Sequence, residues 1–467
     1  MQKLGTLYIV IILLLFFIAY YYFRLDDAYI FYKYAGNIAE GNGYVFNIGE
    51  KVNATTSPLY TLILASIYWI TKHFFIIDFV LIGNFVSIAS ISIILYSAKR
   101  IIKDDDKFYF FALMFLATPL LKFGFSMETF LNLALIFISV YLYIENKLIA
   151  ASAFIGLSVL ARFDSLLFGT IIFLHYIITN KKFPPPLSII VFLSVITPWM
   201  IFSKLYFDSF LPTTIAAKLS QHKLWLFGEG LIFLTNFSRV IPGGYLTIAS
   251  LLTILFVGSF YIYKNRIRVF DNNGIKILLI WSAALFIFYS LIINAPPYQW
   301  YYTPYAIPVA IIFAVSISGF VQSISYKKFV ISILFITACV LPVKNLIQGY
   351  SPKYLNFTGA TTWLNTNSVE GDLIAADDIG ILGFYYTNGK IVDALGLINP
   401  DVSAHLMKKE YDWFLSHYAP RFIVHEYPEL QPHLRGDEKT FWQNYEVTKI
   451  FESASQRIAI YKKININ

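Results

Sequence analysis

Long apolar runs separated by short polar segments dominate the chain up to about residue 345. A helix that crosses a bilayer needs about 20 mostly apolar residues. The pattern therefore predicts an α-helical polytopic protein with about eleven membrane-spanning helices. They are expected at 5–23, 79–98, 107–121, 128–145, 148–161, 164–179, 187–203, 245–263, 276–293, 301–320 and 329–343.

One further apolar stretch, "SPLYTLILASIYWITKHFF" (57–75), raises the question of whether it also crosses the membrane. Basic residues accumulate in cytoplasmic loops. The four basic clusters share the cytoplasmic side with the N-terminus only if 57–75 does not cross, so we expect an interfacial helix along the outer leaflet. The clusters are Lys99/Arg100/Lys103/Lys107, Lys181/Lys182, Lys264/Arg266/Arg268 and Lys327/Lys328.

The opposite side of the membrane then collects the longer loops, which carry mixed charge, Pro, Gly and aromatic residues. Long loops without regular structure are usually functional or disordered, and these are too aromatic to be disordered. The chemistry is therefore expected outside the cytoplasm. These loops are 24–56, 122–129, 161–165, 207–230, 294–305 and everything after about 344.

The sequence changes character near Tyr350, where the apolar runs shorten and charged residues become more frequent. "GDLIAADDIGILGFYY" and "GKIVDALGLINPD" are typical of short strands punctuated by Gly, Asn and Pro. "SAHLMKKEYDWFLSHY" has helical spacing, and three closing strands follow it. We expect a transmembrane catalytic domain at 1–345, with its first outer loop at 24–78, and a small extracytoplasmic α/β domain at 346–467.

Composition supports a membrane protein and excludes several functions. The chain of 467 residues is 57% hydrophobic and 14% charged, against about 25% charged in soluble domains. The net charge of +8 comes from short loops between apolar runs, so no nucleic-acid partner is expected. Cys339 is the single cysteine, which excludes an intrachain disulfide and a two-cysteine metal site. The apolar N-terminus lacks a small-residue cleavage site and is interpreted as a retained first span.

Two adjacent acids, Asp26 and Asp27, follow the first apolar run directly. On a helix their side chains would point about 100° apart, whereas in a loop both could converge on one ligand. Two close carboxylates raise the proton affinity of one, which suits a general base that accepts a proton from a hydroxyl. The alternative interpretation is a solvated helix end.

Other ionisable residues lie at the ends of apolar runs, where charge is costly unless it faces a polar cavity. Glu128 is either a functional acid or an acid favoured by a helix dipole. Arg162 is either a ligand-binding cation or the partner of Asp164 in a local ion pair. Lys218 either binds a ligand or extends to the headgroups. His222 is either a substrate-binding residue or a polar loop residue.

Aromatic residues Tyr298, Trp300 and Tyr301 suit an interfacial belt, but aromatic faces also pack against sugar rings. Lys33 is a further candidate cation. Together, the acids, the cations and the aromatic residues suit transfer of a sugar from a polyprenyl phosphate. The acids are Asp26, Asp27 and Glu128, and the cations are Lys33, Arg162 and Lys218. An acid deprotonates the acceptor hydroxyl, and cations hold the departing phosphate. No nucleotide-binding motif is present, so a nucleotide-sugar donor is not expected.

Several blocks of the sequence are similar to the GT-C superfamily of membrane glycosyltransferases, in the branch that contains the terminal arabinofuranosyltransferase of mycobacterial cell walls. The chain departs from that branch in "LPTT" for its "LPNT", in "RFDS" for its "RPEG", and in a Tyr for the Trp that often follows "PL". The similar blocks are "DDAYIFYKYAGNIAEGNGYVFNIGEKVNATTSPLY", "SMET", "LPTTIAAKL" and "AADDIGILGFYYTNGKIVDALGLINPD".

The resemblance implies an inverting glycosyltransferase of the bacterial inner membrane that uses a polyprenyl-phosphate sugar, a pentofuranose in that branch. By the match, Asp26 or Asp27 is the catalytic carboxylate, and Lys218 and Arg162 contact the donor phosphate. The family varies in metal dependence, so a divalent cation held by Asp26, Asp27 and Glu128 is left open. The acceptor is a glycan, lipid or protein of the cell envelope.

Two other functions compete with this interpretation. A transporter of lipid-linked glycans would carry charge within its spans and a two-fold repeat, neither of which the sequence shows. A non-catalytic assembly protein would depend on its C-terminal domain and not on the acid pair. In that domain Asp377, Asp378 and Asp393 stand near Gly-rich turns, where they either form the turn or bind an acceptor.

Overall fold

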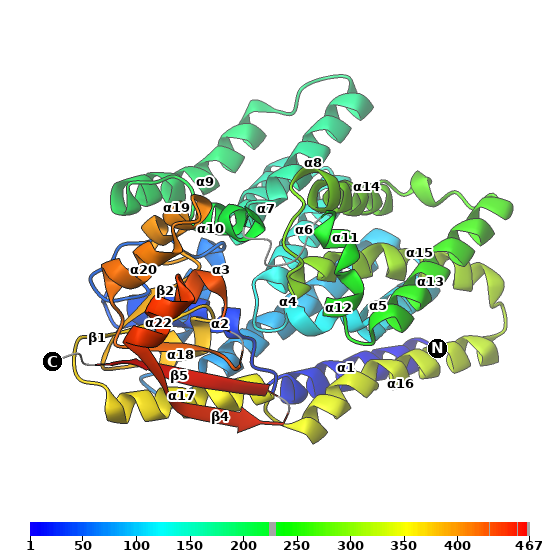
Figure 1. The fold of residues 1–467 in the computed structure, drawn as a ribbon. Helices are drawn as coiled ribbons and strands as arrows, with labels where there is room; N and C mark the ends of the chain where they lie inside the picture. The colour runs from blue at the N-terminus through cyan, green and yellow to red at the C-terminus, as the bar shows by residue number, and fades with distance from the viewer. Residues whose placement is uncertain (224–229, 429, 455, 465–467) are drawn as a thin grey trace. The chain divides into compact units, whose positions relative to one another are not determined.

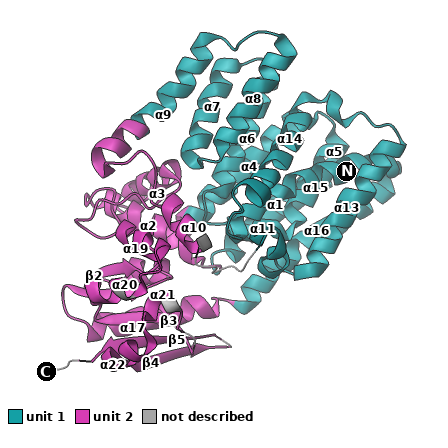
Figure 2. Cartoon of the chain, turned by 45° about the horizontal axis from the view of Figure 1, so that its top comes forward, with its two compact units in different colours: residues 1–22, 83–199, 227–348 teal, residues 23–82, 200–226, 349–467 magenta. Residues whose placement is uncertain are grey.

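The computed structural model describes residues 1–223, 230–428, 430–454 and 456–464. Packing divides the chain into two compact units, shown in different colours in Figure 2. Unit 1 comprises residues 1–22, 83–199 and 227–348, and unit 2 comprises residues 23–82, 200–226 and 349–467. The first outer loop therefore packs with the C-terminal part of the chain, and the expected division into domains 1–345 and 346–467 stays a prediction.

Unit 1 is built from helices, and each of the expected spans contains one of them. In the described residues, seven helical segments are long and apolar enough to cross a membrane: Gln2–Ala19, Phe79–Ile102, Pro186–Phe207, Gly244–Lys264, Asn273–Ile292, Gln299–Phe320 and Ile324–Asn367. The helices are α1 (Gln2–Ala19), α4 (Phe79–Ile102), α5 (Asp105–Ala117), α6 (Thr129–Ile144), α7 (Leu148–Ala161), α8 (Ser165–Asn180), α9 (Pro186–Phe207), α13 (Gly244–Lys264), α14 (Asn273–Ile287), α15 (Ala306–Phe320) and α16 (Ile324–Gln348). Short turns of helix connect them, namely η1 (Pro119–Gly124), α11 (Ile232–Thr235), α12 (Phe237–Val240), η2 (Val269–Asp271), η3 (Phe288–Ile292) and η4 (Gln299–Tyr305).

The helices of unit 1 approach closely where small residues lie between them. A Cβ added to Gly5 of α1 would lie 2.4 Å from the Tyr109 ring of α5. A Cβ added to Gly258 of α13 would lie 2.7 Å from Ile312 of α15. Small residues let apolar helices pack by close contact, as membrane helices do. Figure 1 shows α1 and α16 side by side in the same bundle.

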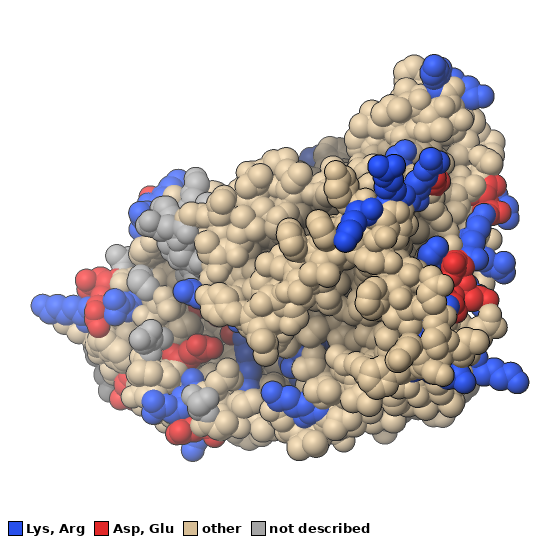
Figure 3. Space-filling model, turned by 90° about the vertical axis from the view of Figure 1, so that its right-hand side faces the viewer, with Lys and Arg blue, Asp and Glu red and all other residues tan. Residues whose placement is uncertain are grey.

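Large apolar side chains cover the outside of these helices. Leu246 and Phe256 of α13 are 77% and 76% exposed, and Phe329 and Ile336 of α16 are each 63% exposed. In the view of Figure 3, a broad central area carries neither acidic nor basic side chains. An apolar surface of this kind marks contact with an apolar partner, and it is what helices long and apolar enough to cross a bilayer require.

The first outer loop folds into two helices of unit 2, α2 (Asp26–Ala39) and α3 (Pro58–Thr71). Ser57 caps α3 by accepting a hydrogen bond from the backbone N–H of Tyr60 at 3.3 Å, and Pro58 occupies the first turn. With 14 residues, α3 is about 21 Å long, shorter than the ~30 Å hydrocarbon core. It exposes Trp69 and Ile70. The expected helix is therefore present, and its interfacial position in the outer leaflet stays a prediction.

The C-terminal part forms a five-stranded sheet in the order β2-β1-β3-β5-β4, which confirms the expected small α/β domain. β1 pairs in parallel with β2 and β3, and β5 pairs antiparallel with β3 and β4. The strands are β1 (Asp372–Ala376), β2 (Gly389–Asp393), β3 (Phe422–Glu426), β4 (Tyr445–Ser453) and β5 (Gln456–Lys463). The helices of unit 2 beside α2 and α3 are α10 (Thr214–Lys223), α17 (Pro352–Asn367), α18 (Gly380–Tyr385), α19 (Pro400–Met407), α20 (Tyr411–Tyr418), α21 (Pro432–Arg435) and α22 (Glu438–Asn444).

One strand expectation is wrong in its second half. "GDLIAADDIGILGFYY" forms β1 only over Asp372–Ala376, and Gly380–Tyr385 is the helix α18. The apolar residues of α18 pack against α2 and α17. A short apolar run is compatible with either a buried strand or a buried helix, so tertiary contacts decide between them.

The two faces of the sheet bury different helices. Ala375, Val392 and Ile423 are neighbours across the parallel strands and share a core with Phe414 of α20 and Leu434 of α21. Their sequence neighbours point to the opposite face, because side chains alternate along a strand. On that face Ile391 lies 3.4 Å from a Cβ position at Gly383 of α18.

A residue of the first loop completes the free edge of β2. The side-chain amide of Asn47 donates to the carbonyl of Ile391 at 2.8 Å and accepts from its N–H at 3.1 Å. Glu50 pairs with Lys390 of the same strand at 2.7 Å. The "VFNIGE" block thus holds the first loop to the sheet.

Candidate active site

The acid pair lies in a helix. Asp26 and Asp27 form the first turn of α2, after Leu25 in an extended conformation. Acidic residues are favoured there by the helix dipole. The hypothesis that both carboxylates converge from a loop is therefore wrong, because adjacent helical residues point about 100° apart.

Asp26 is a buried anchor. Its side chain is 6% exposed and accepts hydrogen bonds from the N–H of Gly380 at 3.0 Å and of Ile381 at 2.8 Å, one on each carboxylate oxygen. A Cβ at position 380 would lie 1.9 Å from the backbone oxygen of Asp26. Only glycine allows this approach, so Gly380 and Asp26 together join α2 to α18.

Asp27 is half-buried, and among the described residues no side chain or backbone group donates a hydrogen bond to its carboxylate. Burial, with Asp26 and Asp378 adding negative charge, raises its pKa to about 7, against the opposing effect of Lys353 and Lys218. Burial and Asp378 also raise the pKa of Asp26, to about 6. Asp27 is thus the carboxylate that is available to a ligand and titrates near neutral pH.

An ion pair from the C-terminal part faces the acids. Lys353 Nζ lies 2.8 Å from Asp378 Oδ2, and the two side chains are 35% and 34% exposed. Asp378, Asp26 and Asp27 all lie close enough to Lys353 to interact with its charge. Sequence reasoning missed Lys353, which is marked only by its place in the first turn of α17 after the capping Ser351.

Two expected phosphate-binding lysines also belong to unit 2. Burial lowers the pKa of Lys33 on α2 to about 8, and the described residues include no carboxylate in an ion pair with it. Lys218 lies on α10, and its charge lowers the pKa of Asp27. The "LPTT" block is fixed by Thr213, whose hydroxyl donates to the carbonyl of Leu397 at 2.6 Å. The side chain of His222 lies outside the described residues.

Glu128 and Arg162 meet in a separate buried network inside unit 1. Arg162 donates to Glu128 at 2.8 Å, to Asp164 at 2.7 Å and to the hydroxyl of Tyr289 at 2.8 Å. Its guanidinium also lies over the Tyr301 ring, 5.0 Å from the centroid. Arg162 is thus neutralised by two carboxylates, so it is a weaker candidate for holding a phosphate than the sequence implied.

The aromatic residues of the loop before α15 are mostly buried. Trp300 and Tyr301 are each 7% exposed. Tyr301 stacks on Tyr289 with centroids 4.8 Å apart, and Tyr298 stacks on Trp300 at 4.9 Å. These rings support the Arg162 network, and their role in sugar binding stays a prediction.

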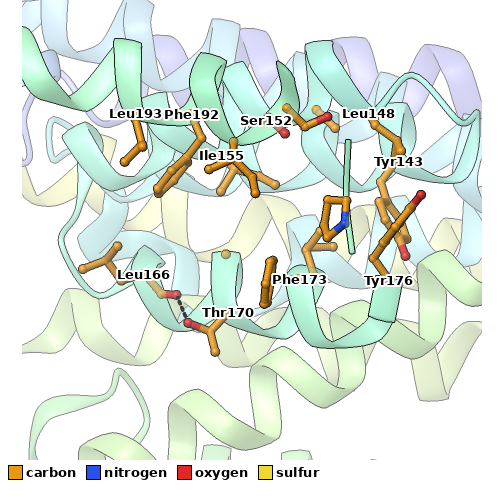
Figure 4. Close-up of a pocket in the computed structure, with 16 residues that line it drawn as sticks. Tyr143, Leu148, Ser152, Ile155, Leu166, Thr170, Phe173, Tyr176, Phe192 and Leu193 are labelled. Carbon is orange, nitrogen blue, oxygen red and sulfur yellow. Dashed lines mark hydrogen bonds between the residues drawn. The ribbon is translucent and has the colours of Figure 1, made fainter. Parts of the chain in front are cut away.

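A cavity of about 490 Å³ lies elsewhere in unit 1. Figure 4 shows side chains of α7 and α9, including Ile155 and Phe192, facing Leu166 and Phe173 of α8. Its lining contains no Asp, Glu, His, Lys or Arg, so the expected pairing of acids with cations does not lie there. In the part of the chain that the structure describes, no three His, Cys, Asp or Glu side chains are grouped as metal ligands require.

The fold is similar to that of known membrane enzymes. ArnT from Cupriavidus metallidurans bound to undecaprenyl phosphate matches with a TM-score of 0.62 and 12% identity, over 98% of this chain and 97% of that one. The archaeal oligosaccharyltransferase AglB from Archaeoglobus fulgidus, in complex with an inhibitory peptide and a dolichol-phosphate, matches with a TM-score of 0.55 and 12% identity, over 99% and 75%. At this identity the likeness establishes the fold.

Sequence comparison adds little to this. Residues 348–461 match a family model described as a domain of unknown function (DUF8728), and no curated protein matches the chain. The structural neighbours are GT-C glycosyltransferases, and the chain is a multi-pass membrane protein with the GT-C fold and a small C-terminal sheet domain. The more specific resemblance to arabinofuranosyltransferases stays a prediction.

Proposed function

We propose that this protein is a glycosyltransferase that moves a sugar from a polyprenyl-phosphate donor to a hydroxyl of a cell-envelope acceptor. One observation carries the proposal: Asp27 is a half-buried carboxylate with a pKa of about 7, without a hydrogen-bond donor among the described residues, in the electrostatic field of Lys353 and Lys218. The GT-C fold supports it, since one neighbour binds undecaprenyl phosphate and another a dolichol-phosphate.

The reaction is a single displacement with inversion. Asp27 takes the proton of the acceptor hydroxyl, whose oxygen forms a bond to the anomeric carbon. The bond between that carbon and the phosphate oxygen breaks, and the polyprenyl phosphate leaves with the electron pair. The departing polyprenyl phosphate is a phosphate monoester whose negative charge is spread over its oxygens, so the step needs cations to stabilise charge and no acid on that side.

Lys33 and Lys218 are proposed to hold the donor phosphate. Among the described residues, no carboxylate forms an ion pair with the ammonium group of Lys33. Burial lowers the pKa of this lysine, and a bound phosphate would stabilise its charged form. Arg162 already lies between Glu128 and Asp164. We therefore assign Arg162 and Glu128 a positioning role within unit 1.

Location and sugar follow from the resemblance. The short basic loops are proposed to face the cytoplasm of a bacterial cell, which places the acid pair and the C-terminal sheet domain outside the inner membrane. A pentofuranose is the proposed sugar, because the "DDAYI" and "DALGLINPD" blocks resemble an arabinofuranosyltransferase branch.

The test uses the full chain purified in detergent, with the polyprenyl-phosphate sugar pool and the envelope extract of a strain that lacks the gene. Asp27→Asn should reduce the rate of sugar transfer by about 10²- to 10⁴-fold, the usual contribution of a general base, and leave thermal unfolding cooperative. Equal transfer by wild-type protein and Asp27→Asn would refute the assignment. A transporter or an assembly protein predicts no transfer by either.

A further inference from the structure

The C-terminal domain has a switch point at the carboxyl ends of two neighbouring strands. β1 and β3 are parallel and adjacent. The chain leaves β1 for α18 on one face of the sheet, and leaves β3 for α21, which packs on the opposite face. In open α/β sheets, ligands bind outside the carboxyl ends of strands that diverge in this way.

Polar side chains gather at this edge. Asp377 follows β1. Its Oδ1 lies 3.0 Å from Nε2 of His433, and its Oδ2 lies 3.4 Å from Nδ1 of His425, which is near the end of β3. Asp378 is the next residue and pairs with Lys353. The Asp377 and His425 side chains are 15% and 11% exposed, whereas the Asp378–Lys353 pair is about a third exposed and accessible to a ligand.

This edge also belongs to the environment of Asp27. Lys353 and Asp378 are named electrostatic neighbours of Asp27 and of Asp26. Asp26 in turn is hydrogen-bonded to Gly380, two residues after Asp378. A molecule bound by the exposed ion pair would therefore lie beside the carboxylate that we propose as the base.

The charges of the edge select the chemistry of its ligand. The Lys353 ammonium faces Asp378, and both His433 and His425 face Asp377. The ammonium of Lys353 already has a carboxylate, and Asp377 and Asp378 add negative charge at this edge, so an anionic group would meet unfavourable charge. A carboxylate has about four acceptor sites and an ammonium three donors. The pair thus keeps several positions for neutral hydroxyl groups.

We propose that the carboxyl edge of β1 and β3 is the acceptor site and that Lys353 and Asp378 bind vicinal hydroxyls of a neutral glycan there. This assignment rests on the proposed glycosyl transfer and gives a role to residues 348–461, which match the DUF8728 model. Asp378 accepts hydroxyl hydrogens, and Lys353 donates to a hydroxyl oxygen.

The experiment separates the acceptor classes. Envelope extract from the strain that lacks the gene is divided by anion exchange into neutral glycans, anionic glycans and protein. Each fraction is offered to the full chain with the same lipid-linked sugar pool, near pH 9, where Asp27 is ionised. Wild-type protein should transfer sugar to the neutral fraction. Asp378→Asn and Lys353→Met should each raise the half-saturating acceptor concentration about tenfold, with the half-saturating donor concentration unchanged.

Arg421→Met is the matched control. Arg421 pairs with Asp372 at 2.7 Å at the opposite edge of the same strands, so its loss should leave acceptor saturation unchanged. Transfer to the anionic or protein fraction alone, or unaltered acceptor saturation in both test variants, would overturn the inference and leave the transferase intact. No transfer to any fraction would overturn the proposed function itself.

Discussion

The backbone N–H of Gly380 donates a hydrogen bond of 3.0 Å to the carboxylate of Asp26, although the two residues are 354 positions apart. The contact joins the first block that resembles the GT-C superfamily to the last one. It also distinguishes two adjacent acids, because it engages Asp26 and not Asp27, which we propose as the base.

The first prediction concerns this contact. Gly380→Ala should destabilise the protein by about 3 kcal/mol, because a Cβ would lie 1.9 Å from the Asp26 oxygen and the helix cannot move without losing its bonds. Thermal unfolding of the full chain in detergent measures this. Gly36→Ala is the control: its Cβ would meet Phe79 at 3.7 Å, and alanine is favoured within α2. Equal stability of both variants would contradict the close approach.

The second prediction concerns the pH dependence of transfer. Asp27 acts as a base only when ionised, so the rate should rise with pH through about 7. Lys353 lowers the pKa of Asp27, and Lys353→Met should therefore move the midpoint to higher pH. Initial rates at saturating substrate between pH 5 and about 9 provide the measurement. Lys390→Met, which removes a lysine paired with Glu50, should leave the midpoint in place.

The third prediction concerns the pH dependence of stability. The pKa of Asp27 is about 7 in the folded protein and about 3.9 in an unfolded chain. The folded state therefore binds this proton more tightly, and stability falls as pH rises from about 4 through 7. Asp27→Asn removes that loss, so it should be more stable than wild type by up to about 4 kcal/mol at pH 8 and similar at pH 4.

Asp26→Asn provides the contrast, because the two backbone N–H groups bond to different carboxylate oxygens, and the amide nitrogen that replaces one oxygen cannot accept. It should unfold more easily than wild type at both pH values. A thermal stability difference for Asp27→Asn that does not change with pH would show that Asp27 does not titrate in this range.

The fourth prediction concerns the network of unit 1. Arg162→Met leaves Glu128, which is 1% exposed, buried without its cation, and should cost about 3–5 kcal/mol. Arg162→Met combined with Glu128→Gln should recover part of that loss, as denaturant unfolding of both variants will show. Lys204→Met removes an exposed ion pair with Asp208 and should not change the unfolding midpoint. Independent, additive effects at Arg162 and Glu128 would contradict a shared network.

Much of the architecture was predictable because hydrophobic periodicity and charge asymmetry act locally along the chain. Every expected span contains a helix, and the C-terminal strands were expected from their alternation and turn residues. The second half of the β1 block was assigned wrongly, because a six-residue apolar segment does not distinguish a strand from a helix. The site was predictable only in part: Asp27 was a candidate, whereas Lys353 carried no distinguishing pattern.

The sequence by itself determined the apolar helices, the basic loops and the acid pair, since each depends on the composition of a few adjacent residues. Only the tertiary structure decided which acid is engaged, because the amides that bind Asp26 come from the other end of the chain. The same holds for Arg162, whose positive charge is neutralised by the carboxylates of Glu128 and Asp164. Burial and the charge of neighbours in space set the proton affinity of a carboxylate, and neither is recorded in the order of residues.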